Sequence, residues 1–169
     1  MNRPVITVTR SGAVVIEAEA DIRRSAEEVF DYASDPASEP EWNIRVKRVQ
    51  KLTSGPAGVD ARYRTAFTQG PPATSECVRF DRPGYWEHAG ESKIISSGFS
   101  GQVMPKDDGS HLLLRMRLRP RGLPRLALPL VRRRMQRELA RDVATITARL
   151  QGAAQPSTSP HRPASQPER

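Results

Sequence analysis

The longest regular pattern in the sequence is a helical one near its C-terminal end. Within residues 126–151, apolar side chains recur at spacings of three or four, which is the period of one helix face. A helix of this length extends about 39 Å. Pro129 predicts a kink or a later start, and Gly152 predicts the end. A chain with such a long apolar stripe must bury it against a second layer. The stripe consists of Leu128, Val131, Met135, Leu139, Val143, Ile146 and Leu150.

The second layer is indicated by strand-like segments that are separated by glycine- and proline-rich turns. After the first strand, Ser25 and Glu28 have the spacing of a capping box, which predicts the start of a short helix. A second helical turn follows Asp35-Pro36 and ends near Trp42. Six further strands then follow in succession. The predicted strands cover residues 13–20, 44–52, 59–69, 73–80, 85–91, 94–104 and 111–119.

Alternation within these segments predicts which side chains share a face of the sheet. In residues 44–52, Ile44 and Val46 fit one face, whereas Val49 and Leu52 require a bulge or a twist. In residues 59–69 one face holds Val59, Ala61, Tyr63, Thr65 and Phe67. In residues 111–119 it holds Leu112, Leu114, Met116 and Leu118.

This order of elements resembles the START/SRPBCC superfamily, and within it the polyketide cyclase/dehydrase-like subset. Three stretches carry the resemblance: IRRSAEEVFDYASDPASEPEWNIRVKRVQKL at 22–52, GPAGVDARYR at 55–64 and LVRRRMQRELARDVATITARL at 130–150. Asp60 departs from it, because relatives often have a second glycine in that turn. The resemblance implies an α+β helix-grip fold. In that fold a curved seven-stranded antiparallel sheet surrounds a long C-terminal helix, with two short helices after the first strand.

Composition suggests how the chain is organised. We expect a single helix-grip domain over residues 1–151, with the first ten residues loosely held. Residues 152–169 contain prolines and serines but no large apolar residue, which predicts a disordered tail. The chain carries a net charge of +8, and residues 115–149 contain 11 arginines but only two acidic residues. This Arg-rich helix face is either a solvated surface or a weak contact with an anionic surface.

Several classes of protein are disfavoured by the sequence. The single cysteine, Cys77, excludes an intramolecular disulfide, and the three histidines are too far apart in sequence to suggest a metal site. We expect no cofactor, and no nucleic acid as a partner, because the basic helix lacks aromatic base-stacking residues. The start of the sequence, MNRPVITVTR, lacks the apolar core of a signal peptide, so we expect a cytoplasmic protein. Nothing in the sequence indicates the oligomeric state.

One helix does not fill a strongly curved sheet, so we expect an internal cavity that binds a hydrophobic small molecule. The expected ligand-binding residues, for which core packing is the alternative, are Tyr63, Phe67, Trp86, Phe99, Leu114, Met116, Met135, Leu139 and Val143. His88 and Tyr63 are weak candidates for catalysis. Two functions therefore stay open. The first is binding of a lipid or an aromatic, polyketide-like compound, and the alternative, which the resemblance implies, is a metal-free cyclase, aromatase or dehydrase.

Overall fold

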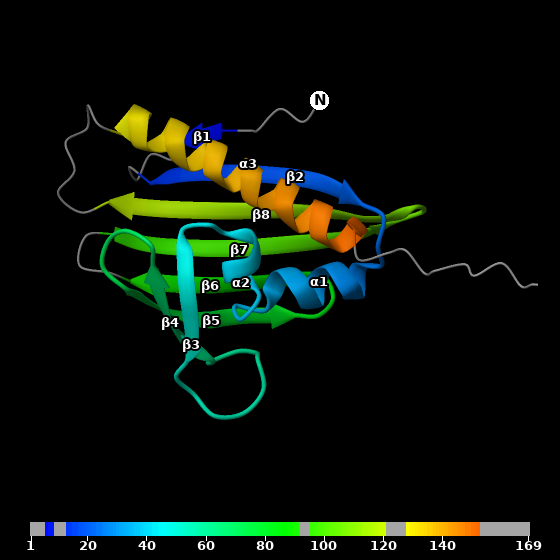
Figure 1. Cartoon of the computed structure of the whole chain (residues 1–169), viewed down its shortest axis with the longest axis horizontal. Coiled ribbons are helices and arrows are strands. Elements are labelled where there is room, and N and C mark those ends of the chain that lie inside the picture. Colours follow the sequence, from blue (N-terminus) through cyan, green and yellow to red (C-terminus); the bar gives the residue numbers. More distant parts are fainter. Residues whose placement is uncertain (1–5, 9–12, 92–94, 121–127, 153–169) are drawn as a thin grey trace, which may run out of the picture.

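The computed structural model describes residues 6–8, 13–91, 95–120 and 128–152. Within these residues it contains one antiparallel sheet and three helices (Figure 1). The helices are α1 (Ala26–Ser34), α2 (Glu39–Trp42) and α3 (Leu128–Gly152). The strands are β1 (Ile6–Val8), β2 (Val14–Ile22), β3 (Val46–Lys51), β4 (Arg62–Phe67), β5 (Ala73–Asp81), β6 (Tyr85–Glu91), β7 (Ile95–Lys106) and β8 (Gly109–Pro120).

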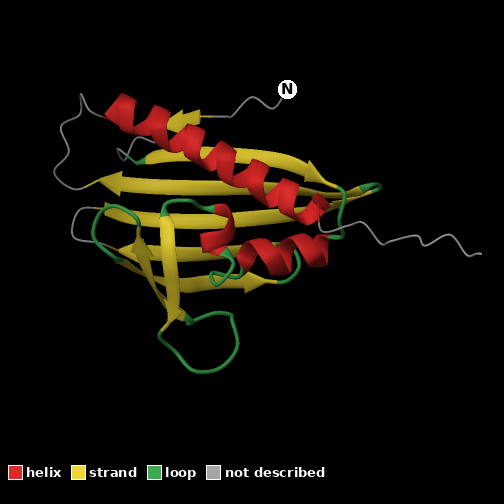
Figure 2. Cartoon of the chain, viewed as in Figure 1, coloured by secondary structure: helices red, strands yellow, loops and turns green. Residues whose placement is uncertain are grey.

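The strands form a curled sheet with the order β1-β2-β8-β7-β6-β5-β4-β3. From β3 to β8, each strand pairs with the next one along the chain, and β2 then pairs with β8. All three helices lie on the same face of this sheet (Figure 2). The expected α+β helix-grip fold is therefore confirmed. One strand was not expected: β1, within the ten residues predicted to be loosely held, pairs with the start of β2.

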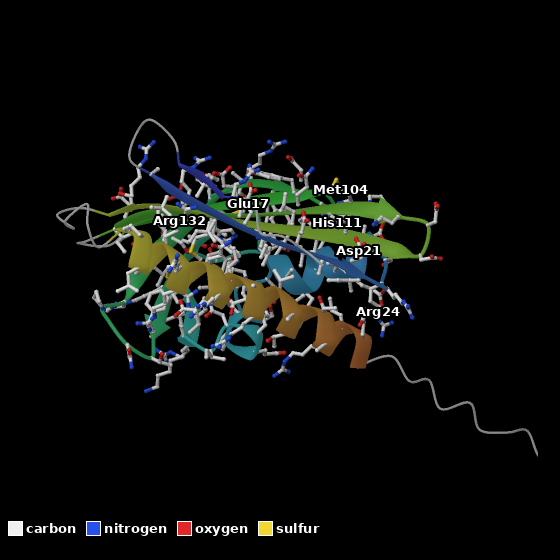
Figure 3. All side chains as sticks on the ribbon, turned by 90° about the horizontal axis from the view of Figure 1, so that it is seen from above. Glu17, Asp21, Arg24, Met104, His111 and Arg132 are labelled. Carbon is white, nitrogen blue, oxygen red and sulfur yellow. The ribbon has the colours of Figure 1, made fainter. Side chains whose placement is uncertain are left out.

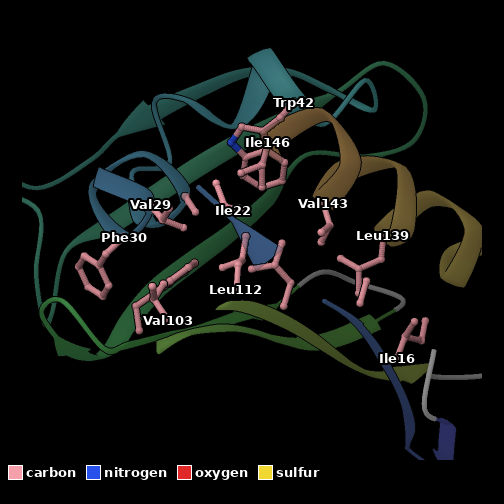
Figure 4. Close-up of a cluster of buried hydrophobic side chains, with 14 of the residues drawn as sticks. Ile16, Ile22, Val29, Phe30, Trp42, Val103, Leu112, Leu139, Val143 and Ile146 are labelled. Carbon is pink, nitrogen blue, oxygen red and sulfur yellow. The ribbon is translucent and has the colours of Figure 1, made fainter. Parts of the chain in front are cut away.

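The long C-terminal helix begins at Leu128, so Pro129 lies in its first turn. Of the two effects predicted for Pro129, a kink or a later start of the helix, the structure shows the later start. The helix ends at Gly152, one residue past the predicted end, and the predicted disordered tail beyond it lies outside the described residues. The middle of its apolar stripe faces the sheet, since Leu139, Val143 and Ile146 are at most 3% exposed. These side chains pack together with residues of β2 and β8 in the main core (Figure 4).

Local sequence signals explain how the elements begin. Ser25 Oγ accepts a hydrogen bond from the backbone N–H of Glu28 at 3.3 Å, and Glu28 Oε2 accepts one from the N–H of Ser25 at 3.1 Å. This capping box starts α1, as predicted. The register of β3 shifts between Val46 and Arg48, which confirms the bulge that the spacing required.

Two predicted strand boundaries are wrong, and turns explain both. Ile44 is 77% exposed because it lies in a turn between α2 and β3, so it shares no buried face with Val46. Val59 is 56% exposed because it lies in the turn that precedes β4. The next residue of that turn, Asp60, has a φ of 66°, in the left-handed region that favours glycine.

The opposite face of the sheet is polar. Arg115 Nε on β8 donates a hydrogen bond to Glu17 Oε1 on β2 at 2.5 Å, and His111 Nδ1 lies 2.7 Å from Asp21 Oδ1. Figure 3 shows Glu17, Asp21 and His111, with Met104 of β7, on the side of the sheet that faces away from α3. The helices therefore cover the apolar face, and the polar face needs no cover.

Candidate functional site

A pocket of about 400 Å³ opens between the concave face of the sheet and the helices. The sheet contributes side chains from β4 to β8, and the other wall is formed by α2, by the loop that precedes it and by α3. Packing does not fill this space because α3 lies over β2, at one side of the curl (Figure 1). The apolar lining residues include Trp42, Phe67, Trp86, Ile95, Phe99, Met116, Leu118 and Met135.

Two tryptophans form rigid parts of the apolar wall. Trp42 stacks on Phe99 with ring centroids 6.4 Å apart, and its Nε1 donates a hydrogen bond to Ser38 Oγ at 3.1 Å. Trp86 is 1% exposed and meets Phe30 edge-on, with centroids 5.3 Å apart. The Trp86 indole packs directly against Gly101, where a Cβ atom would clash with it at a distance of 2.1 Å. These contacts hold both rings in fixed positions.

The structure brings only some of the predicted ligand-binding residues to the pocket. Its lining includes Phe67, Trp86, Phe99, Met116 and Met135. Leu114, Leu139 and Val143 instead lie in the main core. Tyr63 packs with Ala61 and Cys77 in a separate cluster between β4 and β5. Sequence periodicity predicts which face of a helix or strand a residue lies on. It does not predict which part of that face lines the pocket and which part packs in the core.

His88 lies in the middle of β6, between Cys77 on β5 and Phe99 on β7, and lines the pocket. It is 8% exposed, and burial lowers the pKa of its imidazole to about 4. The ring is therefore neutral at neutral pH. The Tyr63 ring lies 5.6 Å away, and neither imidazole nitrogen has a hydrogen-bond partner among the described residues. His88 thus presents a neutral donor and acceptor to the pocket without a protein group that fixes its tautomer.

The helix side of the pocket carries charged groups around Arg45. This arginine follows α2, and its Nη1 lies 3.1 Å from Glu138 Oε2 of α3, while its Nη2 lies 3.7 Å from Asp142 Oδ2. Burial raises the pKa of Asp142 to about 6, although Arg45 opposes the change. Burial also raises the pKa of Glu39 to about 7, against a hydrogen bond of 3.1 Å that its Oε1 accepts from Asn43.

These charged residues were not predicted from the sequence. One signal was present: Asp142 lies three residues after Leu139 and four before Ile146, so it interrupts the apolar stripe of α3. Arg45 and Glu39 gave no comparable signal, because both come from the irregular segment around α2.

The Arg-rich face of α3 lies mostly in solvent. Arg133, Arg137 and Arg141 are exposed, and no ion pair holds any of them among the described residues. Arg134 differs, because its Nε lies 2.9 Å from Glu138 Oε1. The contact of this face with an anionic surface stays a prediction.

Two features are absent from the described residues. No helix in that part of the chain is both long enough and apolar enough to cross a bilayer. Nor do the same residues contain a group of three or more His, Cys, Asp or Glu side chains placed to hold a metal ion.

The fold and the pocket together define a helix-grip protein with an internal site. Residues 13–151 match the model of a family described as polyketide cyclase / dehydrase and lipid transport. The chain therefore belongs to this family. No curated protein sequence matches the chain.

Solved structures show the same fold at low sequence identity. A START superfamily protein from Mycobacterium smegmatis is 14% identical, with a TM-score of 0.68 over 83% of this chain and 99% of that one. The Zhui aromatase/cyclase from Streptomyces sp. R1128 is also 14% identical, with a TM-score of 0.68 over 86% of this chain and 98% of that one. The di-domain aromatase/cyclase StfQ from the steffimycin biosynthetic pathway is 14% identical, with a TM-score of 0.69 over 83% of this chain and 52% of that one.

Proposed function

We propose that this protein binds a hydrophobic or amphipathic small molecule, a lipid or an aromatic polyketide-like compound, in the pocket between the sheet and α3. The observation that carries the proposal is the pocket itself, with its volume of about 400 Å³ and its aromatic lining. Small-molecule sites in proteins have volumes of roughly 300–1,000 Å³ and are predominantly apolar.

The aromatic and methionine side chains of the apolar wall support a hydrophobic ligand. Trp42, Trp86 and Phe99 are held by their own ring contacts, so a ligand meets surfaces that are already ordered. Met116 and Met135 line the same space with flexible side chains, which adapt to ligands of different outline. The printed descriptions of the family and of the neighbouring structures, lipid transport and aromatase/cyclase, also involve hydrophobic molecules.

A neutral aromatic probe tests this proposal. Titration calorimetry with 1-naphthalenemethanol is expected to show saturable binding to the wild-type protein. Met135→Trp fills the pocket from α3 and is expected to weaken binding by about tenfold or more. Met104→Trp is the matched control, because Met104 is 39% exposed and does not line the pocket. Absence of binding, or equal loss in both variants, would contradict the proposal.

A second candidate function is catalysis of the cyclase, aromatase or dehydrase type in the same pocket. It is favoured by the position of His88, whose unpartnered imidazole lines the pocket and is free to hydrogen-bond a bound substrate. Incubation with a linear poly-β-ketone thioester, followed by mass spectrometry, is expected to show a cyclised or dehydrated product. His88→Gln should slow its formation by about 100-fold. An unchanged rate in His88→Gln would remove this assignment.

A further inference from the structure

The polar side of the pocket is acidic, although the chain as a whole is basic. Among the described residues that line the pocket, Asp35, Glu39 and Asp142 carry carboxyl groups, and Arg45 is the one permanent cation. The complete chain, in contrast, has a net charge of +8. An excess of carboxyl groups inside a pocket of such a protein is a local property of the site and does not follow from composition.

Arg45 does not neutralise this side of the pocket by itself. Its guanidinium is shared between Glu138 and Asp142, and its distance of 3.7 Å to Asp142 Oδ2 is too long for a hydrogen bond. Asp142 is 4% exposed, and its Oδ2 has no hydrogen-bond partner among the described residues. A buried carboxylate oxygen without a donor is costly, so it favours any ligand that brings a donor.

Glu39, on α2, is a second buried carboxyl group with few partners. Its carboxyl group receives one hydrogen bond, from the neutral amide of Asn43, and no ion pair joins it to a described cation. Nearby negative charges add to the effect of burial, since Asp142 disfavours ionisation of Glu39, and Glu138 disfavours ionisation of Asp142. A single positive charge placed between α2 and α3 would favour the ionised form of both groups.

We propose that the ligand of this pocket is an amphiphilic amine, whose protonated nitrogen lies beside Glu39 and Asp142 and whose apolar body lies against Trp86 and Phe99. The inference rests on the proposed function, because it specifies the chemical class of the molecule that the same pocket binds. A neutral hydroxyl group would supply a hydrogen bond, but only a cation also balances the charge. A carboxylate head group would add a further negative charge beside the two acids and is disfavoured.

The proposal also predicts how binding depends on pH. The groups around the amine site are Asp35 from the loop before α2, Arg45 after it, Glu138 and Arg134 on α3, and His88 and Glu91 across the pocket on β6. Burial raises the pKa of Glu39 to about 7 and that of Asp142 to about 6, so both take up protons as the pH falls from 7.5 to 5. Amine binding should therefore weaken over this range, whereas binding of a neutral probe should not.

Three probes with the same naphthalene body separate these possibilities: 1-naphthylmethylamine, 1-naphthalenemethanol and 1-naphthoate. Calorimetry at pH 7.5 is expected to give the tightest binding for the amine, by about tenfold over the alcohol, and the weakest for the carboxylate. Glu39→Gln and Asp142→Asn should each reduce the preference for the amine to about threefold or less. Glu27→Gln, an equivalent change at an exposed position of α1 outside the pocket, should leave it unchanged.

The outcomes distinguish the two proposals. If the alcohol binds as tightly as the amine, or the preference survives in both acid variants, the amine inference is wrong while the pocket remains a binding site. If none of the three probes binds, the proposed function fails and the inference fails with it. A wild-type preference that is lost in Glu39→Gln and kept in Glu27→Gln supports the inference even where Asp142→Asn does not fold.

Discussion

Arg45 joins the segment around α2 to the long helix through its guanidinium group. Its contacts with Glu138 and Asp142 hold the segment after α2 against α3 within the helix wall of the pocket, and its Nη1 also donates to Met135 Sδ at 3.5 Å. The arginine side chain is 25% exposed, but the Asp142 side chain is only 6% exposed. Removal of the arginine would therefore leave a buried carboxyl group without its counterion.

Arg45→Ala is expected to lower the free energy of unfolding at pH 7.5 by about 2–3 kcal/mol, less than for a fully buried pair because Arg45 is partly solvated. The matched control is Arg48→Ala, since Arg48 is exposed on β3 and has no ion pair among the described residues. Urea denaturation measures both variants. Equal values for the two would show that the Arg45 contacts do not contribute to stability.

His88 should titrate far below the usual range of histidine. Its pKa of about 4 in the folded protein lies below the ordinary value of 6.5, so only the unfolded chain takes up this proton between pH 6.5 and 4. Stability from this group is therefore complete above pH 6.5 and falls as the pH is lowered. Glu39 and Asp142 have raised pKa values and act in the opposite direction, so a variant is needed to isolate the contribution of His88.

Denaturation of the wild-type protein and of His88→Gln at several pH values makes that comparison. Between pH 6.5 and 4 the wild-type protein should lose on the order of 2–3 kcal/mol more than the variant, and NMR titration should give an imidazole pKa near 4. If the free energies of unfolding of the two proteins changed with pH in parallel, and the imidazole pKa were near 6.5, the His88 ring would be solvated and not buried.

At the scale of elements, α3 owes its position to a few buried side chains. Leu139 is 1% exposed and packs in the main core, whereas Leu130, in the first turn of the same helix, is 74% exposed. Leu139→Ala should cost about 2–4 kcal/mol in the free energy of unfolding, from lost burial and the cavity that remains. Leu130→Ala should change it by about 0.5 kcal/mol or less. A small effect at both positions would mean that α3 is held mainly by other contacts.

The turn before β4 allows a stabilising change. Asp60 has a φ of 66°, which costs roughly 1 kcal/mol for a residue with a side chain and little for glycine. Asp60→Gly should therefore raise the melting temperature by a few degrees, offset in part by the greater freedom of glycine in the unfolded chain. A lower melting temperature would show that contacts of the Asp60 side chain outweigh the backbone strain.

At the scale of the whole molecule, periodicity and turn residues predicted the order of the elements, and the resemblance to the START/SRPBCC superfamily implied how they are arranged. The α3 stripe, the Ser25 capping box and the alternation in β8 each describe a local pattern with one structural solution. The errors at Ile44 and Val59 are of another kind, because an apolar residue in a turn looks like the end of a strand. The edge strand β1 was missed because three residues carry too short a pattern.

The pocket was predictable only in part. Phe67, Trp86 and Met135 could be named because they lie on faces that point inward. Leu139 and Val143 lie on the same face of α3 as Met135 but one and two turns further along it, where α3 packs closely on β2. Arg45, Glu39 and Asp142 were missed because their arrangement depends on how α2 and α3 approach each other in space, which no local pattern encodes.

The central claim, that a hydrophobic molecule occupies the pocket beside α3, is tested most directly by NMR of protein labelled with methyl-13C methionine. The chain has four methionines, of which Met116 and Met135 line the pocket and Met104 lies on the opposite face of the sheet (Figure 3). Saturation with 1-naphthalenemethanol should shift the Met116 and Met135 methyl signals through the ring current of the bound probe, while the Met104 signal stays in place. A saturable shift of Met104 alone, or no shift at Met116 and Met135, would contradict the account.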